Sequence, residues 1–194
     1  MNKKCHWSLA SHLMGDGSWR LRGLALKVGS IMPDILLYTY WTGHKYDTTA
    51  AAVEANLDEL KRTGSWTLYN CFRLGYNLHF LEDYFTYPHN SHFEGGFIAH
   101  CWYEHRLSKA MGAYLRQKRS TSPVPSTCSA VSTVLNHQHS AYMNAIPSPE
   151  VDAAYIVSAA EAVAAEVFEA FSRQSVTPRA RAFMVRTGLA QAEA

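Results

Sequence analysis

Residues 66–89 read WTLYNCFRLGYNLHFLEDYFTYPH, and this stretch decides the fold. The apolar letters in LGYNLHFLEDYF recur every three or four residues, which is the spacing of a helix with a buried face. Ser65 stands where it could cap this helix, and Pro88 biases the residue before it away from helical geometry. The stretch therefore predicts a helix from about Trp66 to Phe85.

The helical periodicity continues through most of the chain. Asp47 or Thr48 could cap the helix that precedes residues 66–89, and Gly64 would close it. No internal repeat and no convincing strand series interrupts the pattern. The further helices are predicted over about 6–14, 18–31, 49–63, 97–118, 127–145 and 149–173. We therefore predict an all-α fold, with a single helical domain over 1–178 and a tail over 179–194.

Length and composition set limits on this prediction. The chain has 194 residues, a usual size for one domain, with 47% hydrophobic and 18% charged residues, which is a globular and not a disordered composition. Its net charge of +2 is too small to argue for nucleic acid or an anionic membrane, so we expect no stable nucleic-acid partner. Ten histidines are the anomaly, because most of them lie before residue 106.

The N-terminal sequence indicates where the protein works. Two lysines open the chain, but His6 and the polar residues after it interrupt any apolar run, so no signal peptide is recognisable. No stretch is long and apolar enough for a transmembrane segment. We therefore expect a cytoplasmic protein. In that reducing compartment the four widely spaced cysteines are expected to be buried thiols rather than disulfides or zinc ligands.

Two histidine–carboxylate pairs carry the chemical signal. His79 and Asp83 are four residues apart on the predicted helix, and His100 and Glu104 repeat the spacing on the next one. Side chains at this spacing lie on one helix face, one turn apart, within reach of one metal ion. His89 lies between the pairs, just after the break at Pro88. Imidazole with carboxylate suits zinc, so two pairs with a histidine at the hinge predict a metal site.

The order His79-x3-Asp83-x5-His89…His100-x3-Glu104 resembles the zinc-dependent phospholipase C family. That family is related to the fungal single-strand nucleases and to the N-terminal domain of glycosylphosphatidylinositol-specific phospholipase D. The segment GSIMPD, residues 29–34, resembles the family's Pro-Asp metal-ligand segment. The resemblance covers roughly residues 5–107 and implies a phospholipase C-like or nuclease-like helical bundle with a multinuclear metal site in a cleft.

The resemblance also implies how two or three zinc ions would be held. The first ion would take four residues, the second three, and the third would take His6 with Asp83 as a bridge. In secreted relatives, the amino group of an N-terminal tryptophan also binds the third ion, and this chain has no such tryptophan. The ligands implied for the first ion are Asp34, His44, His79 and Asp83, and those for the second are His89, His100 and Glu104.

The function implied is hydrolysis of a phosphoester, with a phospholipid headgroup as one candidate substrate. Zinc-bound hydroxide would attack phosphorus, and Asp34 would orient or deprotonate the water as the catalytic residue. Two other functions remain open. One is a single-strand nuclease, although those nucleases carry a His-x3-Asp pattern where this chain has His100-x3-Glu104. The other is a metal-binding helical protein without turnover. The sequence does not indicate the oligomeric state.

Other residues have competing interpretations. Four aromatic residues surround His44 and either pack over an irregular loop or line the substrate pocket. Ile35 replaces the aromatic residue that family phospholipases carry after the metal-binding aspartate, which argues against phosphatidylcholine specificity. Glu82 is either solvated or an acceptor for a liganding histidine. The aromatic residues are Tyr38, Tyr40, Trp41 and Tyr46. The histidines not expected to bind metal are His12, His92, His105, His137 and His139.

Overall fold

The regular elements that the structure describes are helices. The computed structural model describes residues 1–15, 20–36, 44–119, 131 and 134–175, and no strand occurs in these ranges. The all-α prediction is confirmed. In chain order the elements are α1 (Lys3–Met14), α2 (Arg20–Ile31), α4 (Tyr46–Thr63), α5 (Leu68–Tyr84), the 3₁₀ turn η1 (Tyr87–His89), α6 (Phe97–Arg119), the π-helical turn η2 (Val134–Gln138), α8 (His139–Met143) and α9 (Pro149–Ser175).

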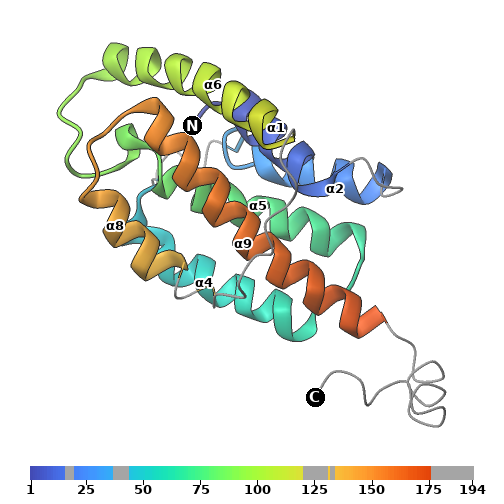
Figure 1. Cartoon of the computed structure of the whole chain (residues 1–194). Helices are drawn as coiled ribbons and strands as arrows, with labels where there is room; N and C mark the ends of the chain where they lie inside the picture. Colours follow the sequence, from blue (N-terminus) through green and yellow to red (C-terminus); the bar gives the residue numbers. More distant parts are fainter. Residues whose placement is uncertain (16–19, 37–43, 120–130, 132–133, 176–194) are drawn as a thin grey trace, which may run out of the picture.

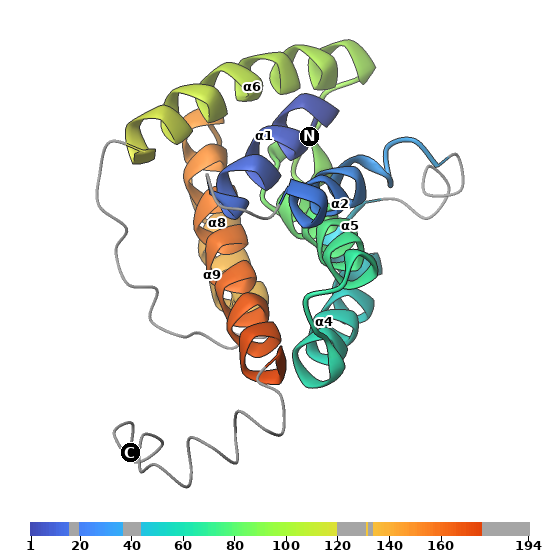
Figure 2. The same ribbon diagram turned by 90° about the vertical axis from the view of Figure 1, so that its right-hand side faces the viewer.

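Helix α5 is the centre of the fold. It packs against α2, α4 and α9, while α6 lies across one end of the bundle and contacts α1 and α9 (Figures 1 and 2). All residues from Asn77 to Tyr84 are buried, so this part of α5 has no solvent face. The burial of His79, Glu82 and Asp83 within it is costly unless these groups are paired. The sequence that decides the fold therefore also sets the position of its charged residues.

Two glycines set the distance between α2 and α5. A Cβ atom added at Gly75 would lie 2.1 Å from the carbonyl oxygen of Leu26, and one at Gly29 would lie 2.1 Å from that of Phe72. Neither contact is possible for a larger residue, so the two backbones approach as closely as only glycine allows. This approach brings the end of α2, and the turn carrying Asp34 after it, against the middle of α5.

Two predicted helix starts are wrong. Helix α5 begins at Leu68 with Thr67 as its N-cap, because the Thr67 side chain accepts from the Asn70 amide at 3.1 Å. The Ser65 carbonyl accepts from the Thr67 amide at 2.7 Å, so Ser65 belongs to the preceding turn. Helix α4 begins at Tyr46 with Lys45 as its N-cap. Asp47 and Thr48 thus lie inside its first turn.

The later part of the chain is only partly described. The helix predicted over 127–145 corresponds in its described part to η2 and α8, while 127–130 and 132–133 lie outside the described residues. Helix α9 matches the helix predicted over 149–173 and ends two residues later. The tail predicted over 179–194 also lies outside the described residues. No helix that the structure describes is long and apolar enough to cross a membrane.

Candidate metal centre

Helix α5 supplies the two central side chains of the candidate centre. His79 Nε2 lies 3.4 Å from Asp83 Oδ2, and both side chains are fully buried. The other ring nitrogen of His79, Nδ1, donates to the Ser30 carbonyl at 2.9 Å. Burial lowers the pKa of His79 to about 4. At neutral pH the ring is therefore uncharged, and its Nε2 lone pair faces Asp83 and is available to a metal ion.

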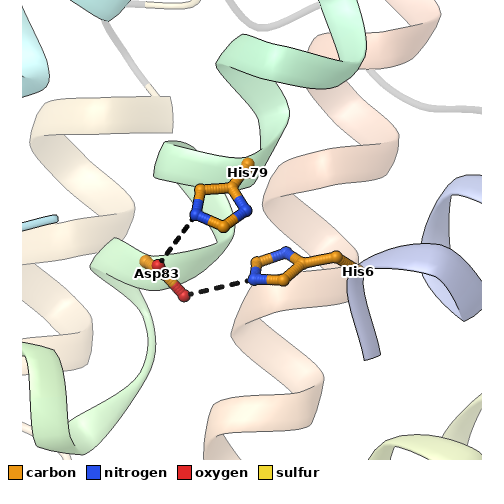
Figure 3. A group of neighbouring side chains, drawn as sticks. All are labelled: His6, His79 and Asp83. Carbon is orange, nitrogen blue, oxygen red and sulfur yellow. Dashed lines mark ion pairs between the residues drawn. The ribbon is translucent and has the colours of Figure 1, made fainter. Parts of the chain in front are cut away.

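His6 reaches the same carboxylate from α1. Figure 3 shows His6 and His79 directed toward Asp83 from different helices, with His6 Nε2 3.6 Å from Asp83 Oδ1. The two imidazole rings are stacked with centroids 4.0 Å apart. The helix begins three residues before His6, with Asn2 as N-cap, so His6 lies in the first turn and does not open the helix as expected.

A buried carboxyl group orients His6. Its Nδ1 lies 2.6 Å from Glu82 Oε2, while its Nε2 is buried and has no hydrogen-bond partner. Burial lowers the pKa of His6 and raises that of Glu82. A carboxyl group that pairs with one ring nitrogen and leaves the other free is the usual arrangement behind a metal-binding histidine. Of the two interpretations of Glu82, the solvated one is wrong.

Asp34 and His44 approach from two loop segments. Asp34 Oδ1 lies 3.7 Å from His79 Nε2, and His44 Nδ1 lies 2.9 Å from Asp83 Oδ2 and 3.2 Å from His79 Nε2. Burial, followed by the charge of Asp83, raises the pKa of Asp34 to about 6. The ligand atoms of Asp34, His44 and His79 all lie within 4.8 Å of one another.

A second group lies between η1 and the start of α6. His100 Nε2 lies 3.1 Å from Glu104 Oε1, and His89 Nε2 lies 3.5 Å from the same oxygen. Burial would raise the pKa of Glu104, but the hydrogen bond from His89 and the nearby Met1 ammonium hold it at about 2. Imidazoles and an ionised carboxylate thus face one position, as a zinc site requires.

The α-amino group of Met1 lies between these groups. Its nitrogen is 2.6 Å from Asp83 Oδ1, 3.0 Å from His89 Nε2 and 3.1 Å from Glu104 Oε1. Burial lowers its pKa, but the charges of Asp83 and Glu104 outweigh that effect and raise it to about 10. Sequence reasoning did not place this cation among the carboxylates.

The candidate ligand atoms form overlapping groups. Four sets of three residues each have ligand atoms within 4.8 Å of one another, and the sets share His44, His79, Asp83 and His89. Nitrogen and oxygen donors of this kind fit zinc, and the unpartnered His6 Nε2 is a polar atom that an ion would satisfy. The sets are His6–His79–Asp83, Asp34–His44–His79, His44–Asp83–His89 and His89–His100–Glu104.

A network behind the centre holds η1 and α6 in place. Asp152 of α9 is fully buried, and its Oδ2 accepts from the Tyr87 amide and the Tyr103 hydroxyl, each at 2.9 Å. Its Oδ1 accepts from the Tyr142 hydroxyl at 2.9 Å. Tyr87 is two residues before His89, and Tyr103 directly precedes Glu104. Sequence reasoning missed this residue, because an aspartate near the start of a helix is ordinarily a terminal charge.

The other histidines, His12, His92, His105, His137 and His139, lie outside the four groups. His12 pairs with Glu161 at 2.9 Å, and His139 stacks on Tyr46 with ring centroids 3.8 Å apart. Two further expectations have mixed outcomes. Cys5 and Cys71 are buried, but Cys101 is exposed, and Cys128 lies outside the described residues. Of the aromatic residues around His44, Tyr46 packs on the core, and Tyr38, Tyr40 and Trp41 lie outside the described residues.

An all-helical fold whose histidines and carboxylates form adjoining groups that could hold a metal ion is the class of protein that these observations define. The family model of zinc dependent phospholipase C matches residues 5–165. The chain therefore belongs to the zinc dependent phospholipase C family, and the family prediction is confirmed. The match extends beyond residues 5–107, to which the resemblance was limited. Neither the curated proteins nor the solved structures contain a match to this chain.

Proposed function

We propose that this protein is a zinc-dependent phosphoester hydrolase with phospholipase C-like chemistry. The observation that carries the proposal is the overlap of the four ligand groups through Asp83, His79, His44 and His89. Overlapping groups provide adjacent cation positions, and adjacent cations are suited to a phosphoester, whose charge grows during attack on phosphorus. Membership in the zinc dependent phospholipase C family supports the same reaction class.

Two or three zinc ions would be held as the family resemblance implies. Asp34, His44, His79 and Asp83 would hold the first, and His89, His100 and Glu104 the second. His6 would bind a third with Asp83 as the bridge, and its 3.6 Å approach to Asp83 supports this assignment. The carboxylates of Asp34, Asp83 and Glu104 carry −3 when ionised. Two divalent cations therefore leave the centre positive, which favours an anionic substrate.

Bound zinc would lower the pKa of its water to about 7 and would stabilise the negative charge that develops on the phosphoester. The protein's own residues would control the proton. We assign Asp34 the role of accepting it from the attacking water, because its carboxyl group is partly exposed at the edge of the centre. The water oxygen bonds to phosphorus, the bond to the leaving oxygen breaks, and the leaving oxygen takes up the proton that Asp34 accepted.

The proposal is tested by metal content and turnover on the same preparations. Mass spectrometry of protein purified without chelator should find two or three zinc ions per chain, and fewer in Asp83→Asn. A chromogenic phosphodiester, phosphatidylcholine and single-stranded DNA would then be assayed with and without chelator. We expect turnover of a phosphoester that chelator abolishes and Asp83→Asn lowers at least about a hundredfold.

The matched control is His137→Ala, because His137 is exposed on η2 and belongs to none of the four groups. It should retain the metal content and turnover of the wild type. Turnover of single-stranded DNA alone would favour the nuclease, and fully zinc-loaded protein that turns over nothing would favour a metal-binding protein without catalysis. Absence of stoichiometric metal after zinc is added back would refute the proposal.

A further inference from the structure

The outer face of α6 is apolar at its start and basic further on. We define this face by the exposed residues Phe97, Ile98, Cys101, Trp102, Arg106 and Lys109. Phe97 is 77% exposed, Ile98 73% and Trp102 66%, which is unusual for three large apolar side chains within two turns. Helix α6 lies across the end of the bundle and packs against α1 and α9 (Figure 2). His100 and Glu104 point inward from the same helix.

The charge on this face has one sign. Among residues 97–119 the only acidic residue is Glu104, and its carboxylate is bonded to His100 within the centre. Arg106 and Lys109 follow Trp102 at helical spacing, and both are exposed. The nearest exposed carboxylate before the helix is Glu94, in the loop. Tryptophan with neighbouring aliphatic and basic side chains is typical of a helix that lies in a lipid interface.

The apolar surface reaches the edge of the metal centre. His100 and Asp34 have the most exposed side chains among the eight candidate ligands, at 32% and 21%. His100 follows Phe97 and Ile98 by one turn or less, and Asp34 directly precedes Ile35 and Leu36, which are 53% and 43% exposed. Exposed apolar side chains therefore adjoin, along the chain, the two most exposed of the candidate ligands.

We propose that the outer face of α6 docks the protein on an anionic lipid surface. The proposal rests on the function proposed above and deepens it, because it makes the substrate a phospholipid still within its bilayer. Phe97, Ile98 and Trp102 would enter the interface, while Arg106 and Lys109 would pair with anionic headgroups. A second copy of the chain fits this face less well, because the face offers no exposed carboxylate to pair with the partner's cations.

Vesicle binding tests the proposal without requiring turnover. Zinc-loaded wild-type protein would be sedimented with vesicles of phosphatidylcholine alone and of an equimolar mixture with phosphatidylserine. We expect binding to the mixed vesicles, and at least about tenfold weaker binding for Ile98→Ser/Trp102→Ser. Arg106→Gln/Lys109→Gln should lose the preference for the anionic vesicles. The matched control is Ile146→Ser/Tyr69→Ser, since these side chains are 86% and 68% exposed but lie outside α6, in the loop before α9 and on α5.

The outcomes separate this proposal from the proposed function. All variants would also be assayed on a soluble chromogenic phosphodiester, whose turnover the face variants should not alter. Turnover of that substrate by wild type without vesicle binding would overturn the docking surface and leave the hydrolase. Vesicle binding without turnover of any phosphoester would overturn the hydrolase and leave the docking surface. Equal vesicle binding by Ile98→Ser/Trp102→Ser, or a wild-type dimer that this variant dissociates, would assign the face another role and overturn the proposal.

Discussion

The Asp152 carboxylate on α9 accepts a hydrogen bond from the Tyr103 hydroxyl on α6 at 2.9 Å. Tyr103 directly precedes Glu104, which is a candidate metal ligand. The same carboxylate oxygen accepts from the Tyr87 amide, two residues before His89. One buried side chain thus connects α9 to both segments that carry the group His89–His100–Glu104. The relationship makes Asp152 a residue whose loss should be felt in the centre although it touches none of the candidate ligands.

Replacement of Asp152 by alanine should weaken both the fold and this metal group. The change leaves the three donors of Tyr87, Tyr103 and Tyr142 without their acceptor in a buried place, so we expect a loss of about 2–5 kcal/mol in unfolding free energy. Urea unfolding with chelator present would measure it. Zinc titration of the folded fraction should show weaker binding of one ion. A variant that binds zinc as the wild type does would limit Asp152 to stability.

The stability of the protein should depend on pH through Asp152. Burial raises its pKa from 3.8 to about 6, despite its three hydrogen bonds. Between these pH values the folded protein keeps a proton that the unfolded chain releases, so the contribution of Asp152 to stability falls as pH rises from about 4 to about 6. Asp152→Asn cannot ionise. The unfolding free energy of wild type relative to this variant should therefore fall by about 2–3 kcal/mol over that range.

The measurement requires chelated protein at a series of pH values, because metal release would otherwise mask the effect. The sign is the decisive result. A difference between wild type and Asp152→Asn that stays constant from pH 4 to pH 7 would mean that the three donors keep the carboxylate ionised in the folded protein.

The sequence predicted the part of the centre that helix geometry alone determines. His79 with Asp83, and His100 with Glu104, are neighbours because four residues make one turn, and the structure brings both pairs together. The position of His89 between the two pairs was predicted from the helix break at Pro88. Asp34, His44 and His6 became candidates only through resemblance to a family, because no local rule tells which distant segment packs against α5.

The relative position of the helices and the partners of distant residues could not be predicted from the sequence, because they depend on contacts between segments far apart in the chain. The position of α2 along α5 depends on the close approach of Gly29 to Phe72 and of Gly75 to Leu26, and these are contacts between residues far apart in the chain. The partners of Asp152 likewise come from three other segments. The N-cap of α5 is Thr67, two residues after Ser65. Capping preference alone does not place a helix start to within two residues, because both residues are good N-caps.

Replacement of Glu82 by glutamine should weaken the metal position that includes His6. Glu82 Oε2 lies 2.6 Å from His6 Nδ1. A metal ion on His6 Nε2 would make Nδ1 the donor and favour ionised Glu82, and an amide would accept from the ring less strongly than that carboxylate. We expect zinc affinity at this position to fall by about 10–100-fold, measured by competition with a chromogenic chelator. Glu59→Gln is the control, because the Glu59 side chain is 45% exposed and its carboxylate pairs with Arg73, away from the four ligand groups. Equal affinities in Glu82→Gln and wild type would remove Glu82 from any role in metal binding.

Replacement of Gly75 by alanine should separate α2 from α5 and displace the His79 ring. The added Cβ would lie 2.1 Å from the Leu26 carbonyl oxygen and 2.9 Å from the Ser30 nitrogen, so the two helices must move apart. The bond from His79 Nδ1 to the Ser30 carbonyl spans this same contact and should lengthen. We expect a loss of about 2–4 kcal/mol in unfolding free energy, together with weaker zinc binding. Gly112→Ala is the matched control on α6, where the nearest atom to the added Cβ is 3.5 Å away, at the end of the Arg116 side chain. That variant should gain up to about 1 kcal/mol from helix propensity and bind zinc normally. If Gly75→Ala were as stable as Gly112→Ala, the close approach of the two backbones would not be what fixes His79 in the centre.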